Sequence, residues 1–321
     1  MEVLWKYIFY TFLYTFSVAL LFSQNSPFNG NGDGSQYNPF QIWDKKDLQE
    51  FADSVYADIF QISWCKNKYF RLMDNIDGVT FEIYGTFFGH FQGNGKQINV
   101  SIESPFFGGL HTGATIDSFI LNGCIYTDDL SIAGIAGGIY NGSIINNCVN
   151  NATIICTDDG SKYGHFPKGS IVAINSNATI SNCINNGDIT GVENVGGITG
   201  QNSGTITNCI NTGKITATNS GSQPNGAGGV GGIVAYGSVS NCINLGSVVG
   251  KNNVGGISGL SSESATITNC INYGFIKGID KVGGICGTIN YLNFPSATIS
   301  NCVNVGVVEG EEDTGSIVGK E

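Results

Sequence analysis

The sequence predicts an all-β protein built as a parallel β-helix, with three strands per turn, about seven turns and a small helix-containing cap at the N-terminal side. Three observations carry this prediction. A short phrase recurs along most of the 321 residues. The apolar runs are short and rich in Ile, Val and Thr, and no run after residue 107 reaches helical length. Glycine supplies 47 residues, but without the G-X-Y period of collagen.

Residues 1–24 are predicted to be a signal peptide. Lys6 precedes the apolar run 7–22, which is shorter than the ~20 residues that span a bilayer, and polar residues follow from Ser23. An uncleaved signal anchor is the alternative. Both interpretations predict a secreted or cell-surface protein, in which four sequons are candidate glycosylation sites: Asn99, Asn141, Asn151 and Asn177.

Residues 29–106 are predicted to form the N-terminal cap. Asp44 is a good N-cap residue for a helix over Lys45–Ala57, which would cover the exposed end of the β-helix. The residues expected on its apolar face are Leu48, Phe51, Ala52, Val55 and Tyr56. Short strands are expected at Tyr69–Met73, Thr86–Phe91 and Gln97–Ile102.

Residues 107–321 carry the repeats. The phrase N-C-[IV]-N contains the cysteines Cys148, Cys183, Cys209, Cys242, Cys270 and Cys302. It alternates with V-G-G-I, which begins at Val195, Val230, Val254 and Val282. The cysteine spacing varies as 35, 26, 33, 28 and 32 residues, which indicates a constant structural unit with loops of different length.

The corners of each turn follow from the spacing of buried positions. Ile180 and Cys183 are three residues apart, so one straight strand cannot bury both, and a bend at Asn182 resolves this. We expect Asn185-x-Gly187 and Gly196-Gly197 to form the other two corners. The alternative is that Asn182 points inward and the cysteines outward.

The six phrase cysteines are expected to form a buried column of free thiols. Neighbours in register on parallel strands point the same way, which is poor geometry for a disulfide. A bridge among Cys65, Cys124, Cys156 and Cys286, which lie off the column, is the alternative. No C-x-x-C pair is present, so no zinc site is predicted.

The alternation of V-G-G-I with T-I-x-N-C-I-N-x-G resembles the GLUG-motif repeats of secreted and surface proteins. The preceding segment is also similar, with Gly32-Asp33-Gly34-Ser35, Tyr69-Phe70-Arg71-Leu72 and Gly93-Asn94-Gly95-Lys96. The resemblance covers residues 30–321 and implies a right-handed β-helix in an extracellular protein. Such repeats also accompany an immunoglobulin-cleaving metallopeptidase family, but its H-E-x-x-H motif is absent from these 321 residues.

Little in the sequence points to catalysis, and no cofactor or metal is expected. His90, His111 and His165 are far apart in the sequence. The pairs Asp128-Asp129 and Asp158-Asp159 fall at similar places in adjacent repeats, where they are either solvated loop carboxylates or Ca²⁺ ligands. The net charge of −11 and the single arginine argue against nucleic acid or anionic lipid as a partner.

Two variable positions in the repeat predict a contact surface. The residue inside the Asn-x-Gly corner and the residue after that glycine become apolar toward the C-terminus. They would form an exposed patch of Leu245, Tyr273, Phe275, Val305 and Val307. A loop or a missing downstream segment that covers the patch is the alternative.

The sequence therefore predicts a non-catalytic, secreted or cell-surface module for adhesion or for use as a stalk, with an extracellular protein or glycan as partner. The alternative function is a polysaccharide-acting β-helix lyase or hydrolase. The strand-like run Thr314–Gly319 stands just before Glu321, which suggests either a fragment or an edge that meets a partner. Membrane contact is expected only through an uncleaved anchor or a missing C-terminal segment.

Overall fold

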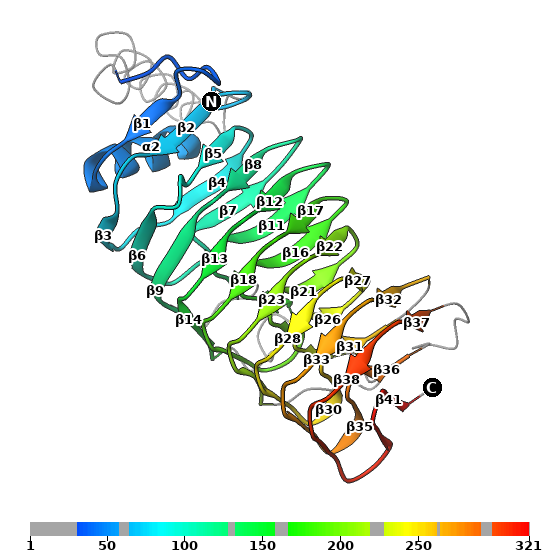
Figure 1. Cartoon of the computed structure of the whole chain (residues 1–321). Helices are drawn as coiled ribbons and strands as arrows, with labels where there is room; N and C mark the ends of the chain where they lie inside the picture. The colour runs from blue at the N-terminus through cyan, green and yellow to red at the C-terminus, as the bar shows by residue number, and fades with distance from the viewer. Residues whose placement is uncertain are drawn as a thin grey trace, which may run out of the picture.

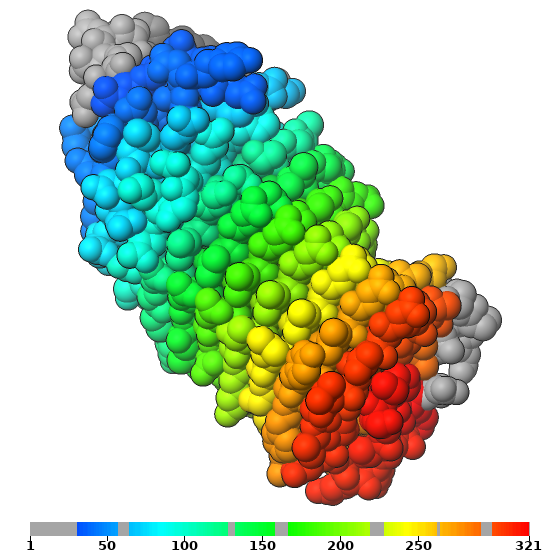
Figure 2. Space-filling view, viewed as in Figure 1, coloured from blue at the N-terminus to red at the C-terminus, as the bar shows by residue number. Residues whose placement is uncertain are grey.

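The computed structural model describes residues 31–57, 64–127, 132–157, 166–218, 228–261, 264–289 and 297–320. The predicted signal peptide, both aspartate pairs and His165 lie outside these ranges. The described residues form an elongated stack of turns that runs from the N-terminal helix to the C-terminal strands (Figure 1). The space-filling view shows the same order as successive bands along a rod (Figure 2). The chain is therefore a parallel β-helix, as the repeats predict.

Sheet A contains ten strands and includes the T-I-x segment of each repeat. Seven of its strands come after residue 107, which agrees with the predicted seven turns. In order, they are β1 (Phe40–Ile42), β2 (Tyr69–Leu72), β5 (His90–Gln92), β8 (Thr115–Asp117), β12 (Ile144–Asn146), β17 (Thr179–Ser181), β22 (Thr205–Thr207), β27 (Val239–Ser240), β32 (Thr266–Thr268) and β37 (Thr298–Ser300).

Sheet B has two columns that meet in the long strand β9 (Ile120–Thr127). The first column is β13 (Val149–Asn150), β18 (Ile184–Asn185), β23 (Ile210–Asn211), β28 (Ile243–Asn244), β33 (Ile271–Asn272) and β38 (Val303–Asn304). The second is β14 (Thr153–Cys156), β19 (Ile189–Gly191), β24 (Ile215–Ala217), β29 (Val248–Val249), β34 (Ile276–Lys277) and β39 (Val308–Glu309). On the N-terminal side, β3 (Ile76–Val79) pairs with β6 (Gln97–Ile102), which pairs with β9.

Sheet D contains the first two residues of V-G-G-I, and sheet C contains the residues that follow this phrase. Sheet D is β10 (Ile132–Ala133), β15 (Lys168–Gly169), β20 (Val195–Gly196), β25 (Val230–Gly231), β30 (Asn252–Gly255), β35 (Asp280–Gly283) and β40 (Thr314–Gly315). Sheet C is β4 (Ile83–Phe87), β7 (Phe107–Leu110), β11 (Ala136–Tyr140), β16 (Val172–Ser176), β21 (Thr199–Asn202), β26 (Val234–Tyr236), β31 (Ser258–Leu260), β36 (Cys286–Thr288) and β41 (Val318–Lys320).

A complete turn contains five short strands rather than the predicted three. The turn that begins with β17 continues through β18, β19, β20 and β21, and the next turn begins with β22. Each strand pairs in parallel with its equivalent in the next turn. The corners predicted at Asn182 and at Gly196-Gly197 are present, and each divides a short apolar run into two strands. The run Thr179–Ile184 bends at Asn182, and Val195–Thr199 bends at the second glycine.

The N-terminal helix is α2 (Lys45–Ala57), with the bounds that the sequence predicts. The Asp44 carboxylate accepts hydrogen bonds from the backbone N–H groups of Lys46 and Asp47, at 2.8 and 3.0 Å. The helix packs chiefly on β4 and inserts Phe51 into the interior. The Phe51 ring lies 4.6 Å from that of Phe70 and 5.5 Å from that of Phe87, centroid to centroid. The helix therefore covers one end of the stack.

Two details of this region differ from the predictions. Tyr56 is exposed rather than buried, because it lies on the outward ring of Tyr84 at 5.9 Å instead of facing the core. The predicted strand Thr86–Phe91 is divided between β4 and β5, because the chain turns at Gly89. A Cβ on Gly89 would lie 2.6 Å from the carbonyl oxygen of Cys65. The strands of residues 40–102 belong to sheets A, B and C, so these sheets continue without a break into the repeats.

Candidate binding surface

The N-C-I-N phrase forms a corner in which side chains point alternately outward and inward. Asn182 has φ of +54°, a left-handed conformation that Asn tolerates better than most residues. The structure then buries Cys183, leaves Ile184 half-buried on the outside, and buries Asn185. The equivalent asparagines Asn147, Asn208, Asn241, Asn269 and Asn301 have φ between +53° and +55°. The cysteines therefore point inward and the first asparagine of each phrase makes the bend.

The second asparagine of the phrase forms a buried ladder along the axis. Asn211 donates one Nδ2 hydrogen bond to Asn244 Oδ1 in the next turn, at 2.8 Å, and another to the Gly213 carbonyl, at 2.9 Å. The same pair of bonds recurs at the neighbouring turns, so the amides satisfy one another inside the apolar core. The members of this inner ladder are Asn150, Asn185, Asn211, Asn244, Asn272 and Asn304.

The second glycine of V-G-G-I leaves the space that the inner ladder occupies. A Cβ on Gly232 would lie 2.4 Å from the Asn244 Cγ and 2.1 Å from the Gly256 carbonyl oxygen. Gly197, Gly256 and Gly284 make equally close approaches to Asn211, Asn272 and Asn304, respectively. The two repeated phrases therefore contact each other across the interior, and this contact explains why they alternate.

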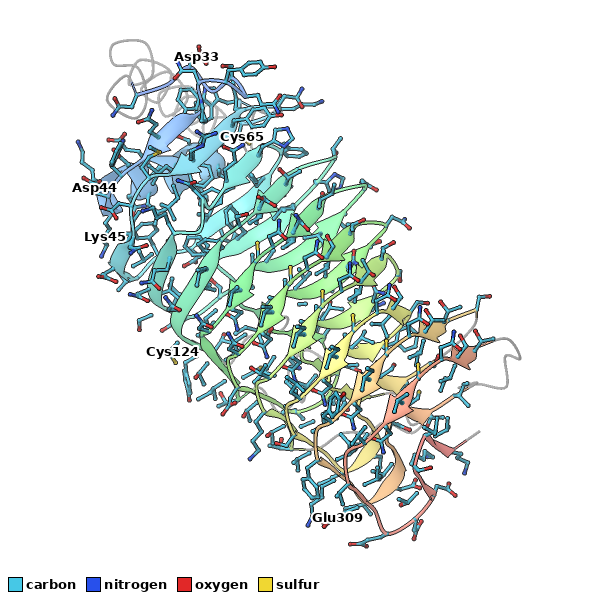
Figure 3. All side chains as sticks on the ribbon, in the orientation of Figure 1. Asp33, Asp44, Lys45, Cys65, Cys124 and Glu309 are labelled. Carbon is cyan, nitrogen blue, oxygen red and sulfur yellow. The ribbon has the colours of Figure 1, made fainter. Side chains whose placement is uncertain are left out.

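The predicted cysteine column lies inside the β-helix. Cys148, Cys183, Cys209, Cys242 and Cys270 are buried, whereas Cys302 in the last turn is half-buried. All of these thiols are free, as are the off-column Cys124 and Cys286. Cys124 is the exposed one and lies within β9 (Figure 3).

Two of the buried thiols, Cys183 and Cys286, have little nucleophilic character. Burial raises the pKa of Cys183 well above its usual value, and it raises the pKa of Cys286 to about 12. The Cys183 thiol also donates to the Ser181 carbonyl, at 3.2 Å. These two thiols stay protonated at neutral pH, so they act as small apolar side chains.

The residue after each inner asparagine points outward and defines an outer column. In the N-terminal turns this column is polar and is linked by hydrogen bonds. Asn151 Nδ2 donates to Asn122 Oδ1 at 2.7 Å, and Asn186 Nδ2 donates to Asn151 Oδ1 at 2.8 Å. Thr212 Oγ1 then donates to Asn186 Oδ1 at 2.8 Å. The polar side chains here bind one another.

The same column becomes apolar in the last three turns, where the predicted patch lies. Backbone bonds from Tyr273 N–H to the Asn244 carbonyl and from Val305 N–H to the Asn272 carbonyl keep successive turns in register. Neighbouring turns are ~4.8 Å apart, so the side chains form two short rows. The exposed fractions of the five side chains range from 37% to 63%. These C-terminal patch residues are Leu245, Tyr273, Phe275, Val305 and Val307.

The structure adds one residue that the sequence interpretation missed. Val303 is 50% exposed and stands in register with the outward Ile271 and Ile243. The signal was present in the sequence, because a residue between inward Cys302 and inward Asn304 must point outward. The apolar surface therefore extends from the patch onto the first column of sheet B.

The remaining candidate residues do not meet in one place. His90 lies in β5 of sheet A, whereas His111 follows β7 outside the strands, and burial lowers the pKa of His90. Among the four sequons, Asn177 and Asn141 are exposed in bends, Asn99 is half-buried, and Asn151 is held in the outer column.

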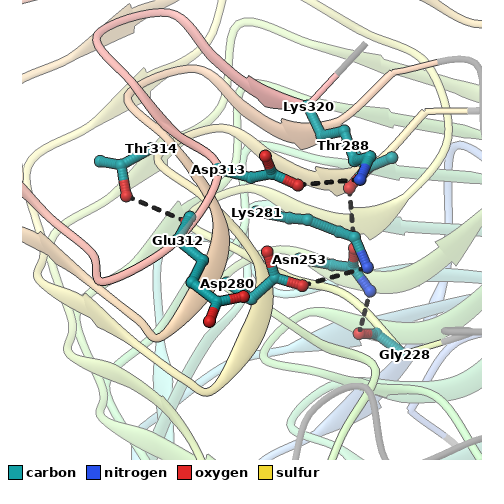
Figure 4. A network of polar contacts seen from close by, with 9 residues as sticks. All are labelled: Gly228, Asn253, Asp280, Lys281, Thr288, Glu312, Asp313, Thr314 and Lys320. Atoms are coloured by element: carbon teal, nitrogen blue, oxygen red, sulfur yellow. Dashed lines mark hydrogen bonds and ion pairs between the residues drawn. The ribbon is translucent and has the colours of Figure 1, made fainter.

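The acidic residues near the C-terminal turns are partly neutralised by lysines. Asp313 lies 2.9 Å from Lys320, and Asp280 lies 3.2 Å from Lys281 (Figure 4). Glu309, labelled in Figure 3, lies 3.3 Å from Lys277. In the described ranges, no group of three or more His, Cys, Asp or Glu side chains has the arrangement of a metal site. No helix in the described part of the chain is long and apolar enough to cross a membrane.

Comparison with known proteins supports the fold. No family model and no curated protein matches this chain. A solved structure described as a "putative immunoglobulin A1 protease" from Bacteroides ovatus is similar, with a TM-score of 0.54 and 19% sequence identity. The alignment covers 89% of this chain and 84% of that chain. At this identity the similarity shows a shared fold alone.

Proposed function

We propose that this chain is a non-catalytic interaction module, secreted or displayed on a cell surface, that binds an extracellular partner through the C-terminal patch. One observation supports the proposal most directly. The outer column is polar and internally hydrogen-bonded in the N-terminal turns, whereas its last three members are exposed and apolar. Contiguous exposed apolar side chains are typical of contact surfaces.

The resemblance to GLUG-motif repeats and the signal-like segment support an extracellular location. We also propose glycosylation at the predicted sequons. Membrane contact is proposed only through an uncleaved signal anchor or a downstream segment. The peptidase activity in the name of the Bacteroides ovatus protein is not transferred to this chain, because the likeness between the two is one of fold. The polysaccharide-acting alternative lacks a specific supporting observation in the described residues.

The test is to measure binding of the purified protein to cell, matrix and glycan preparations. We expect Tyr273→Ser combined with Phe275→Ser to weaken binding or self-association at least fivefold while the thermal unfolding midpoint stays unchanged. Thr190→Ser combined with Thr216→Ser is the matched control on the second column of sheet B. Binding that is unchanged in the patch variant would contradict the proposal. A reducing-sugar assay on uronic-acid polymers, with and without Ca²⁺, checks the alternative enzyme function.

A further inference from the structure

The outward side of sheet A carries two polar rows along the axis. In the first row, Tyr69 is in register with His90, and His90 with Thr115. After Ile144, the row continues with threonines at Thr179, Thr205, Thr266 and Thr298. The second row is Arg71, Gln92, Asp117, Asn146, Ser181, Thr207, Ser240, Thr268 and Ser300. We call these two rows the polar face.

The N-terminal end of the polar face combines an aromatic surface with hydrogen-bonding groups. Tyr69 stacks on His90 with ring centroids 4.3 Å apart, and His90 Nδ1 lies 3.0 Å from Thr115 Oγ1. Beside them, Arg71 Nε donates to Gln92 Oε1 at 2.8 Å. Arg71 has further N–H donors beyond this bond. Aromatic rings next to planar amide and guanidinium groups suit a pyranose ring, which has an apolar C–H face and hydroxyls at its edge.

Farther along, the polar face is regular and uncharged. From Asn146 to Ser300 its rows contain hydroxyl and amide side chains and no ionisable group. Several of these groups already bind each other: Ser181 Oγ donates to Asn146 Oδ1 at 2.8 Å, and Ser240 Oγ to Thr207 Oγ1 at 3.2 Å. Each hydroxyl keeps acceptor capacity after such a bond. The result is a set of hydrogen-bonding groups that repeats every ~4.8 Å along the axis.

We propose that the polar face binds a linear neutral polysaccharide that lies along the β-helix axis, with one end of the glycan on the Tyr69–His90 stack. A polysaccharide of equatorially linked pyranoses repeats at nearly the spacing of the turns, so successive sugars would meet equivalent groups. The charge favours a neutral glycan over an acidic one, since the chain carries −11 overall and Arg71 and Asp117 are the one cation and one anion of the rows. The polar face lies on sheet A, apart from the C-terminal patch at the corner of sheet B.

The experiment measures retention of the full chain on insoluble particles of cellulose, chitin, β-1,3-glucan, mannan and starch at pH 7. We expect binding to at least one of them and weaker binding to soluble polygalacturonate. Thr207→Glu and Tyr69→Ala should each lower the affinity at least fivefold. Thr216→Glu is the matched control, since Thr216 is also a half-buried outward threonine of the same turn but lies on sheet B. Circular dichroism melting curves verify that all variants fold.

Four results would overturn this inference. The first is failure to bind any of the five particles. The second is binding that Thr207→Glu and Tyr69→Ala leave unchanged. The third is binding that the Tyr273→Ser plus Phe275→Ser variant abolishes while Thr207→Glu does not, which would locate the glycan on the C-terminal patch. Cell binding that survives glycan removal yet is lost in Thr207→Glu would point to a protein partner and would also count against it. Loss of cell binding in the patch variant alone tests the proposed function separately.

Discussion

The outer column differs between the two halves of the molecule, whereas the inner ladder does not. In the N-terminal turns, Asn151 and Asn186 face outward and bind each other. In the C-terminal turns, the apolar or aromatic side chains of Val305 and Tyr273 occupy the same place and are 61% and 50% exposed. Both halves use the same backbone bonds and the same buried asparagines. The interior contacts therefore determine the conformation of each turn. The residue at the outward position can be polar or apolar without changing that conformation.

The largest effect is expected inside the ladder. Asn211→Leu would leave the Asn244 Oδ1 atom and the Gly213 carbonyl without their donor in a buried site. Each unsatisfied group costs about 1–3 kcal/mol, so we expect a loss of about 3 kcal/mol in the free energy of unfolding. Urea unfolding measures it. The neighbouring Thr212→Leu, which lies in the outer column, should change stability by less than about 1 kcal/mol. Equal losses in both variants would remove the distinction between inner and outer columns.

A smaller loss is expected where the glycine phrase meets the ladder. Gly232→Ala places a methyl group against Asn244 and should destabilise the protein by about 2 kcal/mol. Gly109→Ala is the control, because its Cβ would lie 3.4 Å from the nearest atom, the Gly138 carbonyl oxygen. Thermal unfolding compares the two. Similar thermal unfolding midpoints for the two variants would contradict the close contact between Gly232 and Asn244.

Substitution of the corner asparagine should destabilise the protein less than either Asn211→Leu or Gly232→Ala. Asn208 has φ of +55°, and Asn208→Ala puts an ordinary side chain into the left-handed region at a cost of about 1–2 kcal/mol. Asn208→Gly adopts this conformation easily and should retain more stability than the alanine variant. The order of the two melting temperatures is the measurement. The reverse order would mean that the exposed side-chain bond to Asn182, at 3.3 Å, outweighs the backbone effect.

The smallest change in stability is expected in the outer column itself. Asn186→Leu removes exposed hydrogen bonds that contribute about 1 kcal/mol or less. It also adds an apolar side chain to the outer column two turns before Leu245, with Thr212 between them, so self-association in sedimentation experiments should increase. Leu245→Asn should have the opposite effect on association, again with little change in stability. If association follows neither substitution, the polarity of this column does not control contacts.

Much of the fold could be predicted from the sequence, because the local patterns concerned have one structural interpretation. The helix bounds follow from Asp44 and the spacing of apolar residues, and the bend at Asn182 follows from the three-residue separation of Ile180 and Cys183. The exposure of the five patch residues also follows from the repeat phase. Other features depend on packing that the sequence does not display. The N-x-G pattern is typical of a turn, so the buried role of Asn185 was missed, although Asn185 lies two residues after the inward Cys183.

The number of strands per turn is another feature that could not be predicted from local patterns in the sequence. A run such as Val195–Thr199 has the composition of one strand, but the close approach of Gly197 to Asn211 bends the chain in its middle. The Gly196-Gly197 pair predicts a corner here, but the division of the run into two strands at this corner depends on a residue in the next turn. The polar face was also not predicted, because its members become neighbours only when all turns are aligned.

The side-chain hydrogen bond between the inner asparagines of successive turns has an evolutionary consequence. Because the inner asparagines from Asn185 to Asn272 each give and receive the same bond, duplication of one complete unit in the gene inserts a turn that fits its neighbours at once. A partial duplication would shift the phase and place an aliphatic side chain against an amide. Lineages that use this architecture are thus expected to differ by whole units, with loop lengths free to drift.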